Sequence, residues 1–183
     1  MNFIMTPMEG LYIIEPKVIG DKRGWFMRTF DFEEWKSNIP NFNFSWAQMN
    51  HSYNKSKGTW RGFHFQIPPY QETKVVRCIS GAILDCVLDI RRESSSFLQI
   101  YTVELTAENK KQLYIPKGFA HGFLTLQQDS EVLYMHDEYY HPEFDRGIKV
   151  DDPSIGFSLE HNIIHMSDRD KSHPLLSPYF KGY

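Results

Sequence analysis

The chain has 183 residues, about the size of a single domain. Its 20 basic and 23 acidic side chains give a formal net charge of −3, which argues against a general nucleic-acid binder. Aromatic residues make up 15% of the chain, which argues against disorder, and no apolar run approaches the roughly 18 residues of a membrane span.

Short runs rich in strand-forming residues follow one another along the chain, each bounded by turn formers such as Ser80-Gly81. No helical pattern alternates with them, which disfavours a parallel α/β fold. The pattern predicts an all-β antiparallel sandwich or barrel, built as a single domain over residues 1–183. The predicted strands cover residues 10–16, 73–79, 82–90, 98–105, 112–116, 122–126 and 131–136.

Helical signals are few. Asp31 and Glu34 have the spacing of a helix cap and predict a short helix over residues 32–36. The chain after Tyr140 is irregular in pattern, with several prolines and glycines. Residues 178–183 are predicted to form a loose tail.

Two cysteines, Cys78 and Cys86, lie inside apolar strand runs. They cannot build a disulfide framework and lack metal-ligand spacing, so both are predicted to be buried free thiols. The N-terminus has no basic start followed by a long apolar stretch, so no signal peptide is expected. We therefore expect a protein of the reducing cytoplasm.

The densest polar segment covers residues 60–66. If it forms a strand, the period of two places Gly62, His64 and Gln66 on one face. Facing the interior of a barrel, that face would contact a ligand through an imidazole and an amide. The alternative is a histidine that is hydrogen-bonded within the core.

A second polar segment carries Pro116, Gly118 and His121 in the order Pro-x-Gly-x-x-His between two predicted strands. A tight turn made by proline and glycine delivers the histidine to the start of the next strand. This spacing resembles the second motif of the cupin superfamily of double-stranded β-barrels.

Many cupins bind a metal through a His-x-His pair, a nearby glutamate and the later histidine. Here Gln66 replaces the second imidazole of the first pair, so the three-ligand set of a catalytic zinc or iron centre is incomplete. The other close pair, His161 and His165, lies in a segment without helix support. We predict a site without metal, in which His64 is free for acid–base chemistry.

Two further residues have side chains suited to proton transfer. Tyr134 shares a strand face with Val132, and a phenol that enters a barrel can donate a proton; a core tyrosine is the alternative. Asp170 could fix the tautomer of an imidazole; a solvated surface charge is the alternative. Nearby cations suit a small anionic ligand such as a phosphate. These cations are Arg23, Arg61, Lys74, Arg77 and Arg169.

From about residue 10 to residue 176 the sequence resembles the dTDP-4-dehydrorhamnose 3,5-epimerases. The resemblance implies a metal-free double-stranded β-helix (a cupin or jelly-roll barrel) with short peripheral helices. It also implies a homodimer, no cofactor, and a role in dTDP-rhamnose biosynthesis. The blocks that carry it are residues 14–24, 48–52, 61–66, 89–92, 105–122, 139–140 and 167–170.

Carried over position by position, the resemblance implies that His64 is the catalytic base and Asp170 its partner. Tyr134 falls on the family's acid, and Lys74 on the lysine beside the sugar ketone. The positions that contact phosphate and sugar fall on Arg23, Gln48, Asn50, Arg61, His121 and Arg169. Two positions depart from the common pattern: Met49 stands where many members have Asp, and Arg28 where many have Glu near the nucleotide base.

The implied reaction is inversion of C3′ and C5′ of dTDP-4-keto-6-deoxy-D-glucose, giving dTDP-4-keto-L-rhamnose. One alternative is an epimerase that acts at a single centre or on another 4-keto-deoxysugar nucleotide. A second is a non-catalytic cupin that binds a sugar nucleotide. A third, a metal-dependent cupin isomerase or dioxygenase, is disfavoured by Gln66.

Overall fold

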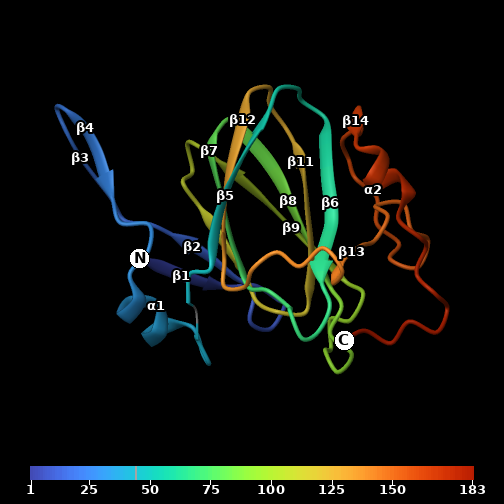
Figure 1. The fold of residues 1–183 in the computed structure, drawn as a ribbon. Helices are drawn as coiled ribbons and strands as arrows, with labels where there is room; N and C mark the ends of the chain where they lie inside the picture. Colours follow the sequence, from blue (N-terminus) through green and yellow to red (C-terminus); the bar gives the residue numbers. More distant parts are fainter. Residues whose placement is uncertain (44) are drawn as a thin grey trace.

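Two antiparallel β-sheets lie face to face in a computed structural model, which describes residues 1–43 and 45–183 (Figure 1). The first sheet has the strand order β1-β2-β10-β7-β12-β5. The second sheet has the order β13-β6-β11-β8-β9, and β14 pairs with β6 in parallel. This arrangement confirms the predicted all-β cupin fold. The strands are β1 (Asn2–Met5), β2 (Tyr12–Glu15), β3 (Val18–Asp21), β4 (Gly24–Met27), β5 (Gln48–Asn54), β6 (Thr59–Gln66), β7 (Lys74–Ser80), β8 (Ala82–Asp89), β9 (Ile100–Thr106), β10 (Gln112–Ile115), β11 (Phe119–Thr125), β12 (Ser130–His136), β13 (Asp145–Gly147) and β14 (His165–Met166); the helices are α1 (Phe32–Asn38) and α2 (Asp168–Ser172).

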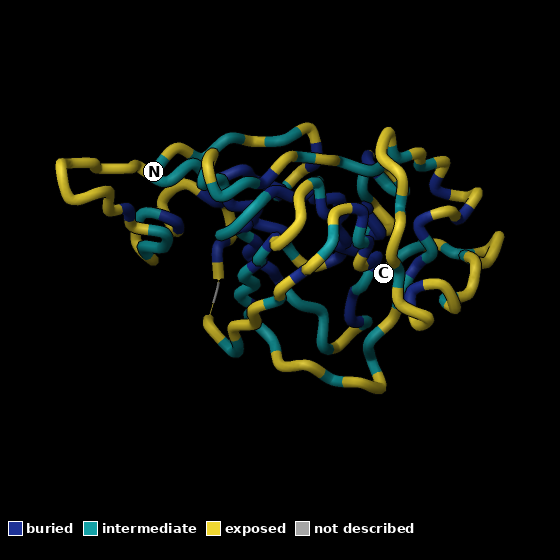
Figure 2. Tube along the Cα trace, turned by 90° about the horizontal axis from the view of Figure 1, so that it is seen from above, coloured by how far each residue is buried: buried dark blue, intermediate teal, exposed yellow. Residues whose placement is uncertain are grey.

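The inner core lies between the two sheets, because alternate residues of each strand point inward. The first sheet contributes residues such as Val76 and Val132, and the second sheet contributes Ile83, Val87 and Phe123. Seen from above, the buried segments form the centre of the molecule and exposed loops surround them (Figure 2).

The outer face of each sheet is covered as well. Helix α1, with Trp35 fully buried, packs over the first sheet, while the C-terminal segment packs over the second. A strand covered on both faces needs apolar residues at every position. This explains why β8 carries apolar residues on both faces, with Val87 in the inner core and Leu88 in the outer cluster; Asp85 and Asp89 are its charged positions.

A β-bulge interrupts β6 at the polar segment. His121 pairs with His64, but Phe123 pairs with Arg61, so β6 has one residue more than β11 between these pairs. The bulge requires glycine: Gly62 has a φ of +133°, and a Cβ there would lie 2.3 Å from the Gly122 Cα.

The bulge corrects the predicted alternation of this segment. Trp60, Phe63 and Phe65 belong to the outer cluster, and Arg61 reaches the cavity that His64 lines. A strict period of two through Gly62 is therefore wrong here, since the extra residue of β6 shifts its phase.

Other predictions have mixed outcomes. Both cysteines are buried and unpaired, and α1 begins after the predicted cap Asp31, whose side chain accepts from the Glu34 N–H. The prediction of a loose tail over residues 178–183 is wrong, because the Tyr183 N–H donates to the Ile90 carbonyl at 3.0 Å and Phe180 stacks on Phe97. In the described part of the chain, no helix has the length and apolar character to cross a membrane.

Candidate active site

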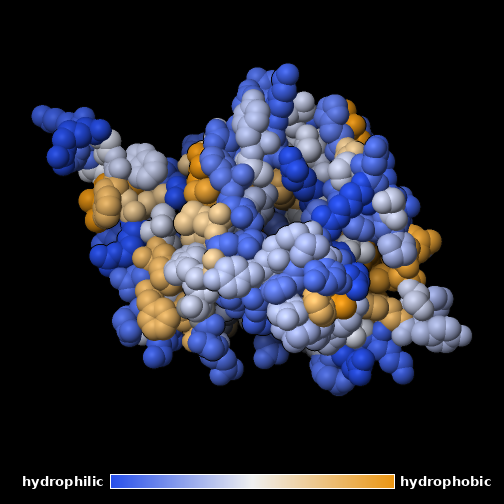
Figure 3. Space-filling model, viewed as in Figure 1, coloured by the Kyte–Doolittle hydropathy of each residue, from blue (hydrophilic) through white to orange (hydrophobic). Residues whose placement is uncertain are grey.

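A cavity of about 350 Å³ opens between the two sheets at one end of the sandwich. It lies where polar side chains replace the apolar inner core, and Figure 3 shows a hollow in the surface between β5 and β6. Strands of both sheets and the start of α2 supply its walls. The lining residues are Asn50, Ser52, Arg61, His64, Lys74, His121, Phe123, Tyr134, His136, Ser167, Arg169 and Asp170.

An adjoining cavity of about 410 Å³ shares four of these residues, namely Asn50, His64, His136 and Arg169. It adds Gln48 and Gln66 to the polar lining. Gln66 is held in place by the Tyr70 and Tyr139 carbonyls, to which its amide donates at 3.0 Å each. Because they share these four residues, the two cavities form one polar depression. Its combined lining can accept an extended ligand.

His64 and Asp170 form a hydrogen-bonded pair in this depression. The His64 Nε2 lies 2.7 Å from the Asp170 Oδ1, although 106 residues separate them in the chain. The Ser167 side chain caps α2 by accepting from the Asp170 N–H, which fixes the carboxylate against β6. Burial would raise the Asp170 pKa, but the hydrogen bond and charge of His64 hold it below its usual value. A charged carboxylate of this kind orients an imidazole and stabilises its protonated form.

Tyr134 lines the same cavity from the first sheet. Its hydroxyl lies 3.0 Å from the Ser52 Oγ, and its ring packs against Phe123. Burial raises the pKa of the Tyr134 phenol well above its usual value, so that the phenol stays protonated and can act as a donor. The shared inward face of Val132 and Tyr134 matches the predicted alternation.

Lys74, also on the first sheet, enters the cavity beside these groups. Its ammonium lies 3.0 Å from Glu72 and donates to the His64 carbonyl at 3.3 Å. The side chain is almost fully buried, so its charge acts in a medium of lower dielectric than water.

The predicted binding residues on the sandwich also meet at the depression. Arg61 donates to the Asn54 side chain at 2.7 Å, and His121 bonds Asp85 at 2.9 Å. Arg169 forms an ion pair with Asp145. Gln48 and Asn50 line the cavities from β5.

Arg23 is the exception among the predicted site residues. It lies at the turn between β3 and β4, a hairpin that projects from the body, and its guanidinium is exposed and paired with Asp21 (Figure 1). It lines neither cavity of the depression. The structure of one chain therefore does not bring Arg23 to the site.

The two departures from the family pattern lie away from the depression in this chain. Met49 is exposed on β5. The residues on either side of it, Gln48 and Asn50, line the depression. Arg28 pairs with Asp31, the cap of α1, at 2.8 Å.

The sequence analysis did not single out several residues that line the depression, among them His136 and Glu72. His136 is two positions after Tyr134 on a strand, so the period of two would have placed both on one face. Glu72 is two positions before Lys74, but it precedes the strand, and no periodic signal marks it. The Glu72 carboxylate contacts both Lys74 and His136.

Within the described residues, one group of histidine and carboxylate side chains has ligand atoms close enough for a metal, namely His64, Asp170 and His173. The first two already share a 2.7 Å hydrogen bond, which a metal ion would have to replace. His173 Nε2 lies 3.7 Å from the same Asp170 oxygen and makes no hydrogen bond within the described chain. The three atoms form a set of ligands only after this rearrangement.

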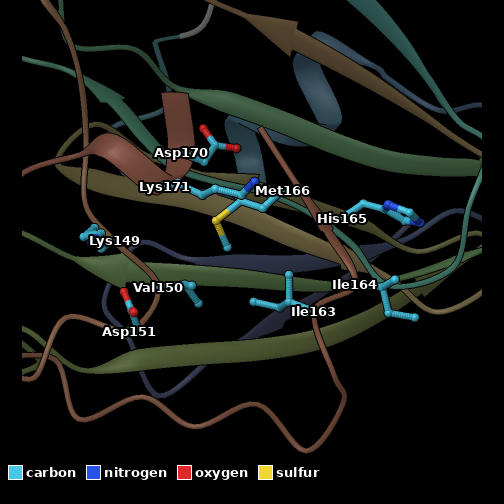
Figure 4. A pocket seen from close by; sticks show the side chains of 9 residues that line it. All are labelled: Lys149, Val150, Asp151, Ile163, Ile164, His165, Met166, Asp170 and Lys171. Atoms are coloured by element: carbon cyan, nitrogen blue, oxygen red, sulfur yellow. The ribbon is translucent and has the colours of Figure 1, made fainter. Parts of the chain in front are cut away.

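A larger cavity, of about 560 Å³, lies under the C-terminal segment (Figure 4). Its lining combines Ile163, Ile164 and Met166 with the half-buried Lys149 and the exposed Lys171. Asp170 is the one lining residue that it shares with the catalytic candidates described above. Size alone does not make it the active site, because it lacks the facing proton donors and acceptors of the depression.

The fold and the depression define a class: a cupin barrel whose polar cavity holds a histidine–carboxylate pair. Comparison with known proteins gives the family. Residues 5–178 match the family model described as dTDP-4-dehydrorhamnose 3,5-epimerase, and the chain belongs to that family.

Individual relatives agree with this assignment. The dTDP-4-dehydrorhamnose 3,5-epimerase of Escherichia coli K12 is 46% identical over 155 residues, covering 85% of this chain and 83% of the relative. The Bacillus anthracis epimerase structure with TDP and PPi bound has a TM-score of 0.91 at 36% identity, covering 96% and 99%. A Legionella pneumophila epimerase structure in complex with dTDP-4-keto-L-rhamnose has a TM-score of 0.89 at 35% identity, covering 95% and 92%.

Proposed function

We propose that the protein inverts C3′ and C5′ of dTDP-4-keto-6-deoxy-D-glucose and so produces dTDP-4-keto-L-rhamnose. One observation carries the proposal: the His64–Asp170 pair and Tyr134 line one cavity from opposite sheets, in a chain of the 3,5-epimerase family. Inversion needs a base and an acid on two sides of the sugar ring, and this arrangement supplies both.

The proposed chemistry begins with the ketone at C4′, which acidifies the protons on C3′ and C5′. Because His64 Nε2 bonds Asp170, Nδ1 is the nitrogen left to accept a proton. Negative charge then gathers on the C4′ oxygen, where the Lys74 ammonium stabilises it in the transition state. The Tyr134 phenol returns a proton from the other side, which inverts the centre.

The remaining predicted residues fit a diphosphate and a sugar. Arg61, Arg169 and His121 offer cationic or N–H donors, and the amides of Gln48 and Asn50 suit hydroxyl groups. The molecules bound to the two structural relatives support this use, since one holds TDP and PPi and the other dTDP-4-keto-L-rhamnose.

The decisive experiment is incubation of the protein with dTDP-4-keto-6-deoxyglucose in D₂O, followed by NMR of the sugar. We expect deuterium at C3′ and at C5′ together with the inverted product. Deuterium at one carbon only would show a single-centre epimerase. Nucleotide binding without exchange would show a non-catalytic sugar-nucleotide-binding cupin, and either result would overturn the proposal.

We further propose that the reaction needs no metal. Each potential ligand of the depression is already engaged by a protein group: His64 by Asp170, His121 by Asp85, and Glu72 by Lys74. Prolonged treatment with EDTA should therefore leave the exchange rate unchanged. Loss of exchange in EDTA and its recovery with one divalent ion would contradict this proposal.

The proposed assembly is a homodimer of single-domain subunits. The projecting hairpin carries the exposed apolar side chains of Ile19, Trp25 and Phe26, a surface that a second copy would bury. The partner subunit's Arg23 would then be available to the phosphates, which the chain's own Arg23 does not reach. Sedimentation analysis should give twice the mass of the chain. The two unpaired thiols suit the cytoplasm as the compartment.

A further inference from the structure

A continuous chain of contacts crosses the wall that the first sheet contributes to the depression. The Lys74 ammonium lies 3.0 Å from Glu72 Oε1, and His136 Nδ1 lies 2.7 Å from Glu72 Oε2. At the far side of the ring, His136 Nε2 lies 3.3 Å from the Asn50 amide nitrogen. The strand register supports the chain, since His136 pairs directly with Lys74 across β12 and β7.

Glu72 at the centre of this chain is a fixed negative charge. Burial alone would raise its pKa, but the charge of Lys74 and the hydrogen bond to His136 outweigh burial and lower the pKa to about 2. The carboxylate is therefore ionised near neutral pH. Glu72 is thus a permanent counter-ion for Lys74, and it lies in the connection that leads into β7.

The contacts of Lys74 also fix the direction of its ammonium. An ammonium has three N–H donors on a flexible four-carbon stem. One donor points to Glu72 and a second to the His64 carbonyl, which leaves one for the cavity. Without these two acceptors the stem would be free to take several rotamers.

His136 connects this arrangement to the substrate-binding side. Its Nδ1–H donates to Glu72, and its Nε2 then accepts from the Asn50 amide. The Asn50 amide is thereby oriented with its oxygen free for a ligand. A single imidazole thus sets both the glutamate that holds Lys74 and the amide that faces the sugar.

We propose that Glu72 and His136 are positioning residues for the reaction: they aim the Lys74 ammonium at the oxygen that becomes negative and orient the Asn50 amide. This inference rests on the proposed function, because it assigns a reacting oxygen to the cavity. Neither residue needs to touch the substrate or exchange a proton with it.

A double-mutant cycle tests the role of Glu72. The variants are Glu72→Gln, Lys74→Ala and the double variant, and the readouts are kcat and KM for deuterium exchange and the Kd of dTDP. Glu72→Gln should lower kcat by about tenfold to a hundredfold, the scale of a misplaced catalytic group, with the Kd of dTDP little changed. In the Lys74→Ala background the same change should have little further effect, because its target is gone. Equal losses in both backgrounds would overturn the inference.

A second pair of variants tests His136 and guards against a folding defect. His136→Phe keeps a ring of similar size and removes both hydrogen bonds, so KM should rise and kcat should fall. The matched control is His51→Phe: His51 pairs with Glu131 at 2.8 Å on the exposed face of β5 and lines neither cavity. The control should keep the wild-type constants. Wild-type constants in His136→Phe would overturn the role of His136.

The controls separate this inference from the proposed function. A wild-type protein without any exchange would reject the proposed function itself. A wild-type protein with full exchange, combined with an additive cycle, would reject the positioning role alone. Thermal unfolding of each variant identifies those that lose activity by unfolding, and the binding of dTDP provides a second check.

Discussion

Two histidine–carboxylate pairs face the same depression, and they differ in how the fold holds them. His64 on β6 meets Asp170 on α2, an element that reaches the sandwich from the end of the chain. His121 meets Asp85 between the neighbouring strands β11 and β8. The side chains of the first pair are 32% and 4% exposed, and those of the second 6% and 0%.

We propose that this difference gives the two pairs different tasks. A base must reach the substrate's carbon-bound proton, and His64 has the exposed edge that permits this. His121 is held by the register of two strands and by a buried carboxylate, so its ring is fixed in place and suits binding rather than the abstraction of a proton. In this proposal the same two residue types serve proton transfer in one place and binding in the other, because the pairs differ in exposure and in the elements that hold them.

The largest expected effect separates the two histidines. His64→Ala should lower deuterium exchange at both sugar carbons by about 10²–10⁴-fold, the usual loss for a general base, with dTDP binding largely intact. His121→Gln should instead weaken substrate binding and keep measurable exchange. NMR exchange rates and calorimetric Kd values check both. Near-normal exchange in His64→Ala would reject it as the base.

Substitution of the two carboxylates, Asp170 and Asp85, should likewise affect exchange in the first case and substrate binding in the second. Asp170→Asn should keep the fold and slow exchange by up to about 10⁴-fold, because an amide does not stabilise an imidazolium as a carboxylate does. Asp85→Asn should change KM more than kcat. An unchanged rate and pH profile in Asp170→Asn would mean that the pair is only structural.

Tyr134→Phe should separate exchange from inversion. The change removes the hydroxyl that bonds Ser52 and leaves the packing of the ring. His64 can still remove a proton and return deuterium to the same face, so exchange should persist while net epimerised product falls much further. If exchange and product fall together, or neither changes, another group supplies the proton.

The smallest effect concerns His173, which lies beside the first pair without joining it. Its ring packs on Gly147, where a Cβ would lie 2.1 Å from Nε2. Burial, with the nearby charge of His64, lowers the His173 pKa from 6.5. The unfolded chain therefore takes up this proton first, and the folded state loses stability as the pH falls below about 6.5.

His173→Phe should remove that part of the pH dependence. Thermal unfolding at pH 5 and pH 8 should show a smaller drop for the variant than for the wild type, within about 2–4 °C for a chain of this size. Identical pH dependence in both proteins would mean that His173 titrates alike in the folded and unfolded states.

Local pattern was enough to predict the strand-rich fold and the capped helix, because hydrophobic alternation and capping depend on neighbours in sequence. His136 was within reach of the same argument, since it is two positions from Tyr134. The bulge at Gly62 was not, because it depends on the approach of Gly122 from another strand. The ordered tail was missed for a similar reason: Tyr183 is fixed by a carbonyl of Ile90, far away in sequence.

The candidate site itself needed the family resemblance. Nothing in the residues around Asp170 distinguishes it from a solvated charge; its partner lies 106 positions earlier. Arg23 shows the limit of assigning roles by position in a family. Its position matches the family pattern, but in one chain alone its side chain lies outside the depression.

The distance in sequence between His64 and Asp170 has a consequence for biosynthesis. The ribosome makes the base first and its carboxylate only near the end of the chain, when the strands of both sheets have already been synthesised. A product that terminates just before α2 would still contain those strands, yet its base would have no carboxylate partner. Under the proposed mechanism, full activity therefore depends on a carboxylate that is synthesised after all the strands of the two sheets.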